Sequence, residues 1–398
     1  MLIPKGSEEE DRDDMDDSLI HIARDTARSV YELLIESAEE TDTTATWQSS
    51  DMKTEEMVYE VHAYAGTTGI ALYLADYGHA FSEDRAILLA EKALTWADLD
   101  ANDTTWSRMA QERHLSVAAG KPGIALGWLR LSQGSAFQGA IEKAKDRAAD
   151  LLTMNAPPLP GLLVGAAGSG ILLLRLWERT GDDRYLERAG EFAQGITANQ
   201  WDQLEFGMGK GLSGIGHFWL AFYELTGDKE WLELVHRSAD WLTEHARPDR
   251  GFLNWPVDPA DAETAKCQWC HGAVGVGQYL ARAYVQTLDS RHLKAAVAAA
   301  ECTYAYGDNT NRAGQCHGLT SKAELFLELG RITDDVMWYD RTSEFMQLTL
   351  GYRHETPEGV RWEADGPGVY SPDLMRGAAG VGHFCLRIID TTLRLPLL

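Results

Sequence analysis

The sequence of 398 residues has few cations: 36 Lys and Arg stand against 61 Asp and Glu, which gives a formal charge of −25. A protein that binds nucleic-acid phosphates needs cationic side chains to replace the counterions. The charge balance therefore argues against a nucleic-acid partner. Hydrophobic residues nevertheless make up 44% of the chain, which is typical of a globular protein with a large core.

Long apolar runs are also missing. No apolar stretch reaches the ~20 residues that a membrane span requires, and the longest candidate, residues 161–176, is interrupted by glycines and by Arg175. The N-terminus has no apolar core of signal-peptide length, so we expect a cytoplasmic protein. Residues 1–16 are rich in acids and predict a disordered tail, which precedes a single folded domain over residues 17–398.

Cysteine is scarce, and its number is odd. Five cysteines in a long chain without a secretion signal do not indicate a disulfide framework. Cys302 and Cys385 fall within predicted helices, and we interpret both as core residues. Cys267 lies three residues before Cys270, but a zinc ribbon would need a second such pair. We therefore interpret Cys267 as a packing residue, with a role as a metal ligand as the alternative.

Glycine is abundant, and its placement organises the chain. The 37 glycines exceed the average usage of about 7%. One phrase recurs seven times at intervals of 45 to 61 residues: a glycine, two residues, a second glycine or small residue, and then an apolar run. Its copies begin at Gly66, Gly120, Gly165, Gly211, Gly272, Gly318 and Gly377.

Each copy predicts two helices. The segment after the glycines is apolar nearly all round, as in a buried helix, and the amphipathic segment that follows, such as residues 183–194, should lie outside it. Two copies share a Thr-Gly-Asp turn, at 180–182 and 226–228, in which glycine ends one helix and aspartate caps the next. No window shows sustained alternation of apolar and polar residues, so we expect little sheet.

The two ends of the chain favour a closed ring. The seventh apolar helix runs from Gly377 to Asp390 with no outer helix after it, whereas residues 17–39 form a surplus amphipathic helix at the start. Both ends are satisfied if the first helix packs behind the last. We therefore predict an all-α fold, an α/α toroid of seven inner and seven outer helices. An open solenoid with capping repeats is the alternative.

The repeat glycines also fix which residues face one end of this ring. We expect glycine to let the inner helices approach one another around the axis. The residue before each repeat glycine should lie at the end of the ring where the inner helices start. In chain order these residues are Ala65, Ala119, Val164, Lys210, His271, His317 and Arg376.

Two of these positions belong to matched Cys-His-Gly units in neighbouring repeats. Cys270 and His271 precede one repeat glycine, and Cys316 and His317 precede the next, 46 residues later. Thiolate and imidazole are the ligands that zinc prefers, and three protein ligands would leave a fourth position open for catalysis. The alternative is a pair of buried thiols with two core histidines.

These motifs resemble the lanthionine synthetase C-like (LanC-like) family. The resemblance rests on the seven Gly-x-x-Gly helices, the units ending in Cys270-His271-Gly272 and Cys316-His317-Gly318, and the closing segment 374–380; it covers residues 18–390. It implies an α/α toroid with zinc on Cys270, Cys316 and His317. In bacteria it implies cyclisation of a dehydrated ribosomal precursor peptide. Eukaryotic relatives instead join glutathione to dehydroamino acids in proteins.

The chemistry that the resemblance implies needs a thiolate and a proton donor. Zinc lowers the pKa of a bound thiol. Addition of the resulting thiolate to dehydroalanine or dehydrobutyrine produces an enolate, which must be stabilised and protonated. Lys210, His271 and Arg376 are our candidate catalytic residues because they should surround the metal. Alternatively, Lys210 is a solvated residue or a contact to the leader segment of the peptide.

Two positions depart from the pattern of the family. Lys210 stands where bacterial cyclases usually have a histidine, and Gly161 stands where they usually have an aspartate; both of those residues are taken as acid/base groups. The position of His271 is often tyrosine in stand-alone cyclases, whereas histidine is found there in eukaryotic and fused forms. We therefore expect the proton donor of this protein to differ from that of the bacterial cyclases.

The sequence thus predicts a zinc-dependent lanthipeptide cyclase that acts on a dehydrated precursor peptide. A dehydratase or kinase–lyase of the same pathway is a further expected partner. The alternatives are a LanC-like glutathione transferase and a non-catalytic peptide-binding scaffold in a modification complex. A toroidal glycoside hydrolase would need paired carboxylates at the active face, and Asp365 and Asp373 have no evident partner there.

Overall fold

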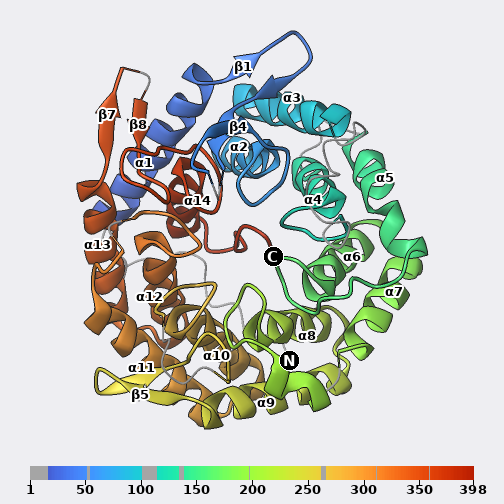
Figure 1. The fold of residues 1–398 in the computed structure, drawn as a ribbon, viewed down its shortest axis with the longest axis vertical. Helices are drawn as coiled ribbons and strands as arrows, with labels where there is room; N and C mark the ends of the chain where they lie inside the picture. Colours follow the sequence, from blue (N-terminus) through green and yellow to red (C-terminus); the bar gives the residue numbers. More distant parts are fainter. Residues whose placement is uncertain are drawn as a thin grey trace.

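The described part of the chain forms two concentric rings of helices (Figure 1). The structure is a computed structural model. It describes residues 17–51, 54–100, 114–133, 139–196, 198–260, 266–310, 312–357 and 359–398. The predicted acidic tail, residues 1–16, lies outside the described residues.

Among the described residues, the inner ring contains seven helices, and each begins directly after a repeat glycine. They are α2 (Thr67–Phe81), α4 (Lys121–Leu131), α6 (Ala166–Thr180), α8 (Leu212–Thr226), α10 (Ala273–Thr287), α12 (Leu319–Thr333) and α14 (Ala378–Ile389). Buried residues fill most positions of these helices, as their apolar sequences predict.

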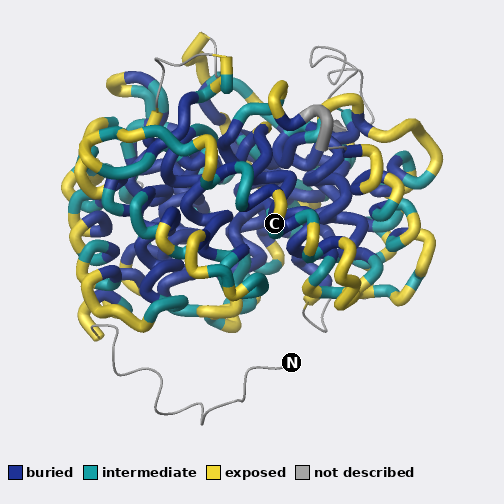
Figure 2. Tube along the Cα trace, turned by 90° about the horizontal axis from the view of Figure 1, so that it is seen from below, coloured by how far each residue is buried: buried dark blue, intermediate teal, exposed yellow. Residues whose placement is uncertain are grey.

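The outer ring, as far as the structure describes it, also contains seven helices. They are α1 (Asp17–Glu36), α3 (Asp84–Asp100), α5 (Ala140–Thr153), α7 (Asp183–Gln194), α9 (Lys229–Glu244), α11 (Ser290–Tyr306) and α13 (Val336–Gly351). Most carry one buried stripe, and Figure 2 shows the buried residues gathered inside the exposed outer wall. The predicted α/α toroid is therefore confirmed.

The ring closes through the first helix. Helix α1 packs against α14, and α14 packs in turn against α2 of the first repeat. Tyr73 of α2 donates a hydrogen bond to the carbonyl of Ala27 in α1 at 2.6 Å. Helix α1 is thus the outer partner of α14, and the closed ring holds rather than the open solenoid.

The loops that precede the inner helices are joined by backbone hydrogen bonds around the ring. In most of these contacts, the amide of the residue two positions before a repeat glycine donates to the carbonyl of the equivalent residue in the next repeat. The bonds run from Tyr64 to Ala118 (3.0 Å), Ala118 to Leu163 (3.0 Å), Leu163 to Gly209 (2.9 Å), Met208 to Trp269 (3.3 Å), Cys270 to Cys316 (3.3 Å), Cys316 to Met375 (2.8 Å) and Met375 to Tyr64 (3.1 Å). This circle of loops carries the residues of the candidate site.

We expected the repeat glycines to let the inner helices approach one another, but the structure gives a different reason for them. A Cβ at Gly272 or Gly275 would collide with the backbone of the loop just before α10 rather than with another inner helix. A third glycine, such as Gly216, makes room for an aromatic ring of the next inner helix, here Tyr279. The close approach of neighbouring helices therefore explains this further glycine, which some copies carry two residues after the second, whereas the two glycines of the phrase itself accommodate the loop.

Strand is confined to four two-stranded antiparallel hairpins within the described residues, as expected. They pair β1 (Glu39–Glu40) with β2 (Ala45–Thr46), β3 (Gln48–Ser50) with β4 (Met57–Tyr59), β5 (Arg247–Asp249) with β6 (Phe252–Asn254), and β7 (His354–Thr356) with β8 (Gly359–Arg361). Of the described helices, none combines the length and the apolar character needed to cross a membrane.

Candidate metal centre

The loops before α10 and α12 bring together the three predicted metal ligands. The ligand atoms of Cys270, Cys316 and His317 all lie within 4.8 Å of one another. The amide of Cys270 donates to the carbonyl of Cys316, so the ring of loops holds the two cysteines in register. Cys316 is buried, while Cys270 and His317 are half-buried.

The two thiols shift each other's pKa in opposite directions. A hydrogen bond from Cys270, followed by contacts with His317 and Tyr64, holds the pKa of the Cys316 thiol well below its usual range. The same hydrogen bond and burial raise the pKa of Cys270 well above its usual range. One thiolate is thus already favoured, and a divalent cation would stabilise the second.

Asp365 holds the imidazole of His317 from behind. Its Oδ1 lies 2.9 Å from His317 Nε2, which leaves Nδ1 as the nitrogen for a metal. Burial lowers the pKa of His317, but Asp365 and Cys316 more than offset it and raise the pKa to about 9. A carboxylate on the second ring nitrogen is the usual outer partner of a metal-binding histidine.

Arg376 lies behind this carboxylate. It is 2% exposed, and its Nη1 donates to Asp365 at 2.6 Å while its Nη2 donates to Asp373 at 3.0 Å. Burial raises the pKa of Asp365, but His317 and Arg376 outweigh it and lower the pKa to about 2. Arg376 therefore acts on the centre through Asp365, and both aspartates are committed to it rather than forming a free carboxylate pair.

His271 is paired with a carboxylate beside the centre. Its Nδ1 lies 3.3 Å from Glu205 Oε2, and its side chain is 19% exposed. Burial raises the pKa of Glu205, but His271, Lys210 and Lys266 more than offset it, so the pKa is lowered. The carboxylate thus contacts one ring nitrogen of His271, and Nε2 is the other.

Gly161 and Lys210, the two positions that depart from the family pattern, lie in contact with each other. A Cβ at Gly161 would lie 2.7 Å from the Cα of Lys210 and 2.9 Å from its carbonyl oxygen. An aspartate at position 161 would therefore require a backbone shift at Lys210. Lys210 itself is exposed and lies near enough to Glu205 to lower the pKa of that carboxyl.

The sequence analysis missed two residues of the centre. The Tyr64 hydroxyl is hydrogen-bonded to Cys316, and burial together with Cys316 and Cys270 raises its pKa well above the usual range. Tyr64 stands two positions before its repeat glycine, as Cys270 and Cys316 do, so reading that position would have found it. Asp365 lies in the loop between β8 and α14, where no repeat signal points to it.

The remaining cysteines lie away from the ligand atoms. Cys267 is 2% exposed, and its Sγ is 3.5 Å from the Thr303 hydroxyl. Cys302 and Cys385 are both fully buried in helices, and all five cysteines are free thiols. Their surroundings agree with a role in packing.

An α/α toroid with a Cys-Cys-His set at one end of its inner ring is the class that fold and site define. The family model for lanthionine synthetase C-like protein matches residues 57–397, so the chain belongs to this family. A glutathione S-transferase LANCL1 from Danio rerio is 29% identical over 197 residues. That match covers 48% of this chain and 45% of the zebrafish protein, less than half of each.

Solved structures share the fold. Nisin cyclase superposes with a TM-score of 0.63 at 14% identity, covering 93% of this chain and 95% of that one. Cellobiose 2-epimerase from Bacillus thermoamylovorans B4167 superposes with a TM-score of 0.55 at 11% identity, covering 94% and 100%. At these identities the likeness shows the toroid alone, and activity has to be argued from the site.

Proposed function

We propose that the protein is a zinc-dependent lanthipeptide cyclase, which joins cysteine thiols of a dehydrated precursor peptide to dehydroalanine or dehydrobutyrine. The observation that carries the proposal is the grouping of Cys270, Cys316 and His317 within 4.8 Å, in a chain of the LanC-like family. A dehydratase or kinase–lyase that prepares the peptide is the partner that this chemistry requires.

The residues present fit zinc. Two cysteines and a histidine form a donor set that zinc prefers, and Asp365 supplies the outer partner of the histidine. Three protein ligands leave one position for a substrate thiol. When bound, zinc supplies charge that keeps such a thiol deprotonated near neutral pH.

Residues of this chain supply the proton that the addition requires. The substrate sulfur loses its proton and forms a bond to Cβ of the dehydroamino acid, while the electrons of the C=C bond move to the enolate and a proton is returned to Cα. We assign the delivery of that proton to His271, whose Nδ1 lies 3.3 Å from Glu205 Oε2. Lys210 is exposed, and its positive charge stabilises the enolate or binds the peptide. Arg376 keeps His317 in position through Asp365.

A glutathione transferase is the second candidate. It is favoured by the alignment with the zebrafish protein named as such and by His271 directly after Cys270. The chemistry at the dehydroamino acid is the same, but the thiol comes from glutathione rather than from the peptide itself. Only the source of the thiol distinguishes the two enzymes.

The test compares two reactions of the zinc-loaded protein. One uses a dehydrated peptide that contains a free cysteine, and the other uses a cysteine-free dehydrated peptide with glutathione. Loss of alkylatable thiol at constant mass reports a thioether ring, whereas a mass gain of one glutathione reports transfer. Turnover in neither reaction, with binding of the peptide retained, would replace both enzymes with the peptide-binding scaffold.

A further inference from the structure

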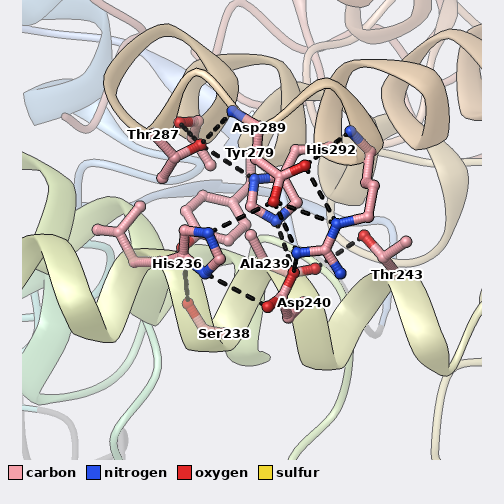
Figure 3. A network of polar contacts seen from close by, with 12 residues as sticks. His236, Ser238, Ala239, Asp240, Thr243, Tyr279, Thr287, Asp289 and His292 are labelled. Atoms are coloured by element: carbon pink, nitrogen blue, oxygen red, sulfur yellow. Dashed lines mark hydrogen bonds and ion pairs between the residues drawn. The ribbon is translucent and has the colours of Figure 1, made fainter.

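A second cluster of metal-binding side chains lies on the outer wall, between α9 and α11 (Figure 3). His236 and Asp240 are four residues apart on α9, which places them on the same face of the helix. His292 lies in the first turn of α11. The ligand atoms of these three residues lie within 4.8 Å of one another, and none of the three takes part in the centre of Cys270 and Cys316.

The hydrogen bonds of His292 leave a position for a cation. The Thr287 hydroxyl donates to the carbonyl of Ala283 at 2.9 Å, so its oxygen accepts from His292 Nδ1 at 3.1 Å. That tautomer turns the lone pair of Nε2 toward Asp240 Oδ1, 3.0 Å away. Two acceptors then face each other, an arrangement that a cation between them would stabilise.

The three ligands differ in how far solvent reaches them. The His292 side chain is fully buried, whereas His236 and Asp240 on the facing helix are reached by solvent. A metal ion would therefore have an open path to the two outer ligands and a fixed third ligand behind them.

The cluster also has an excess of negative charge. Asp240 and Asp289 contribute two carboxylates, and Arg291 is the cation on both, with Nη2 at 2.8 Å and 2.6 Å from them. With neutral histidines the cluster thus carries one net negative charge. The Arg291 side chain is 56% exposed, so it can turn into solvent without leaving a buried charge.

We propose that His236, Asp240 and His292 form a second metal site, which takes a divalent transition-metal ion such as Zn²⁺. Two imidazoles and one carboxylate suit zinc, whereas magnesium and calcium prefer oxygen ligands throughout. Arg291 covers the Asp240 carboxylate until the ion arrives and then withdraws. The ion links α9 and α11, the outer helices on either side of α10, whose preceding loop carries Cys270.

The experiment titrates zinc into full-length protein that has already been loaded at the cysteine centre. We expect one further ion per chain by calorimetry. With cobalt as the probe, this second ion shows visible ligand-field bands but adds no thiolate-to-metal charge-transfer absorption, because its ligands are nitrogen and oxygen. The readout involves no turnover, so it stands or fails independently of the proposed cyclase activity.

Two variants and a matched control locate the second ion. His236→Ala removes a half-buried ligand without opening the core, and it should weaken binding by more than the roughly 10–100-fold that loss of an outer partner costs. His21→Ala is the control, because His21 and Asp25 form the same pair four residues apart, at 3.3 Å, outside any group of three ligands among the described residues. It should leave the second ion unaffected.

Arg291→Gln separates a metal site from a structural ion-pair network. It removes the competing cation, so the metal site predicts tighter zinc binding, whereas a purely structural network predicts a lower melting temperature with zinc affinity unchanged. The proposal is overturned if the zinc-loaded protein takes up no second ion, if His21→Ala weakens uptake as much as His236→Ala, or if Arg291→Gln fails to tighten it.

Discussion

The amide of Met375 donates to the carbonyl of Tyr64 at 3.1 Å and so joins the last repeat to the first. The next bond of the same circle runs from the Cys316 amide to the Met375 carbonyl at 2.8 Å. The Tyr64 hydroxyl also reaches the Cys316 thiol. Closure of the ring and construction of the metal centre therefore depend on the same backbone contacts.

Removing the first helix should open the ring. A chain that begins at residue 41 lacks α1, and α1 is the helix that packs on α14. Each apolar side chain that is uncovered loses about 1.5–3 kcal/mol of burial, so we expect a large fall in melting temperature and binding of a hydrophobic dye. A chain that begins at residue 17 is the control. Equal melting of the two shortened chains would contradict closure through α1.

Asp365→Asn should weaken zinc binding while the fold is kept. The amide can still accept from Arg376, but it lacks the charge that makes His317 a stronger ligand. Loss of such an outer partner costs about 10–100-fold in metal affinity, which competition with a chelator measures. Asp373→Asn is the comparison, since Asp373 contacts Arg376 rather than His317. An affinity loss as large in Asp373→Asn would assign the effect to Arg376.

His271→Ala should stop turnover without releasing zinc. General acid catalysis contributes about 10²–10⁴-fold, and His271, paired with Glu205, is the general acid that we propose. Lys210→Ala should have a smaller effect, because Lys210 is exposed. Rates of thioether formation, measured beside zinc content, decide between them. Should only Lys210→Ala lose turnover, the proton donor is Lys210.

Acid should destabilise the fold through the buried His217. Burial, followed by Arg282, lowers its pKa to about 3, against a usual value of about 6.5 in an unfolded chain. The unfolded state therefore binds the proton more tightly. The stabilisation is complete above about pH 6.5 and is lost as the pH falls toward 3, at up to about 1.4 kcal/mol per pH unit.

Unfolding by denaturant at several pH values checks this. His217→Gln removes the titrating group, so its stability should fall less steeply below pH 6.5 than that of the natural protein. His245→Gln is the control because His245 is exposed. Parallel curves for the natural protein and His217→Gln would show that His217 does not carry the acid slope.

The repeat register made most of the fold predictable. The seven glycine phrases fixed where the inner helices start, and the position of Cys270 and Cys316 within the phrase placed both at one end of the ring. Arg376 occupies that register too, but its side chain turns behind His317 to reach Asp365, which a register cannot reveal.

Contacts made by residues outside the repeat positions could not be predicted from the sequence. Asp365 lies in a loop without periodicity, and its role depends on how that loop folds back toward His317. The cluster on the outer wall combines a pair of residues on α9 with His292 on another helix. The spacing of His236 and Asp240 alone does not distinguish this pair from the exposed pair on α1.

The central claim is a zinc centre made by Cys270, Cys316 and His317 that drives the addition of thiols. The most direct measurement is the zinc content and thioether-forming rate of the same samples, made in the His236→Ala background so that only this centre is counted. We predict about one zinc per chain with turnover, and loss of both in Cys316→Ala. Metal-free protein that is folded and still forms thioethers would contradict the account.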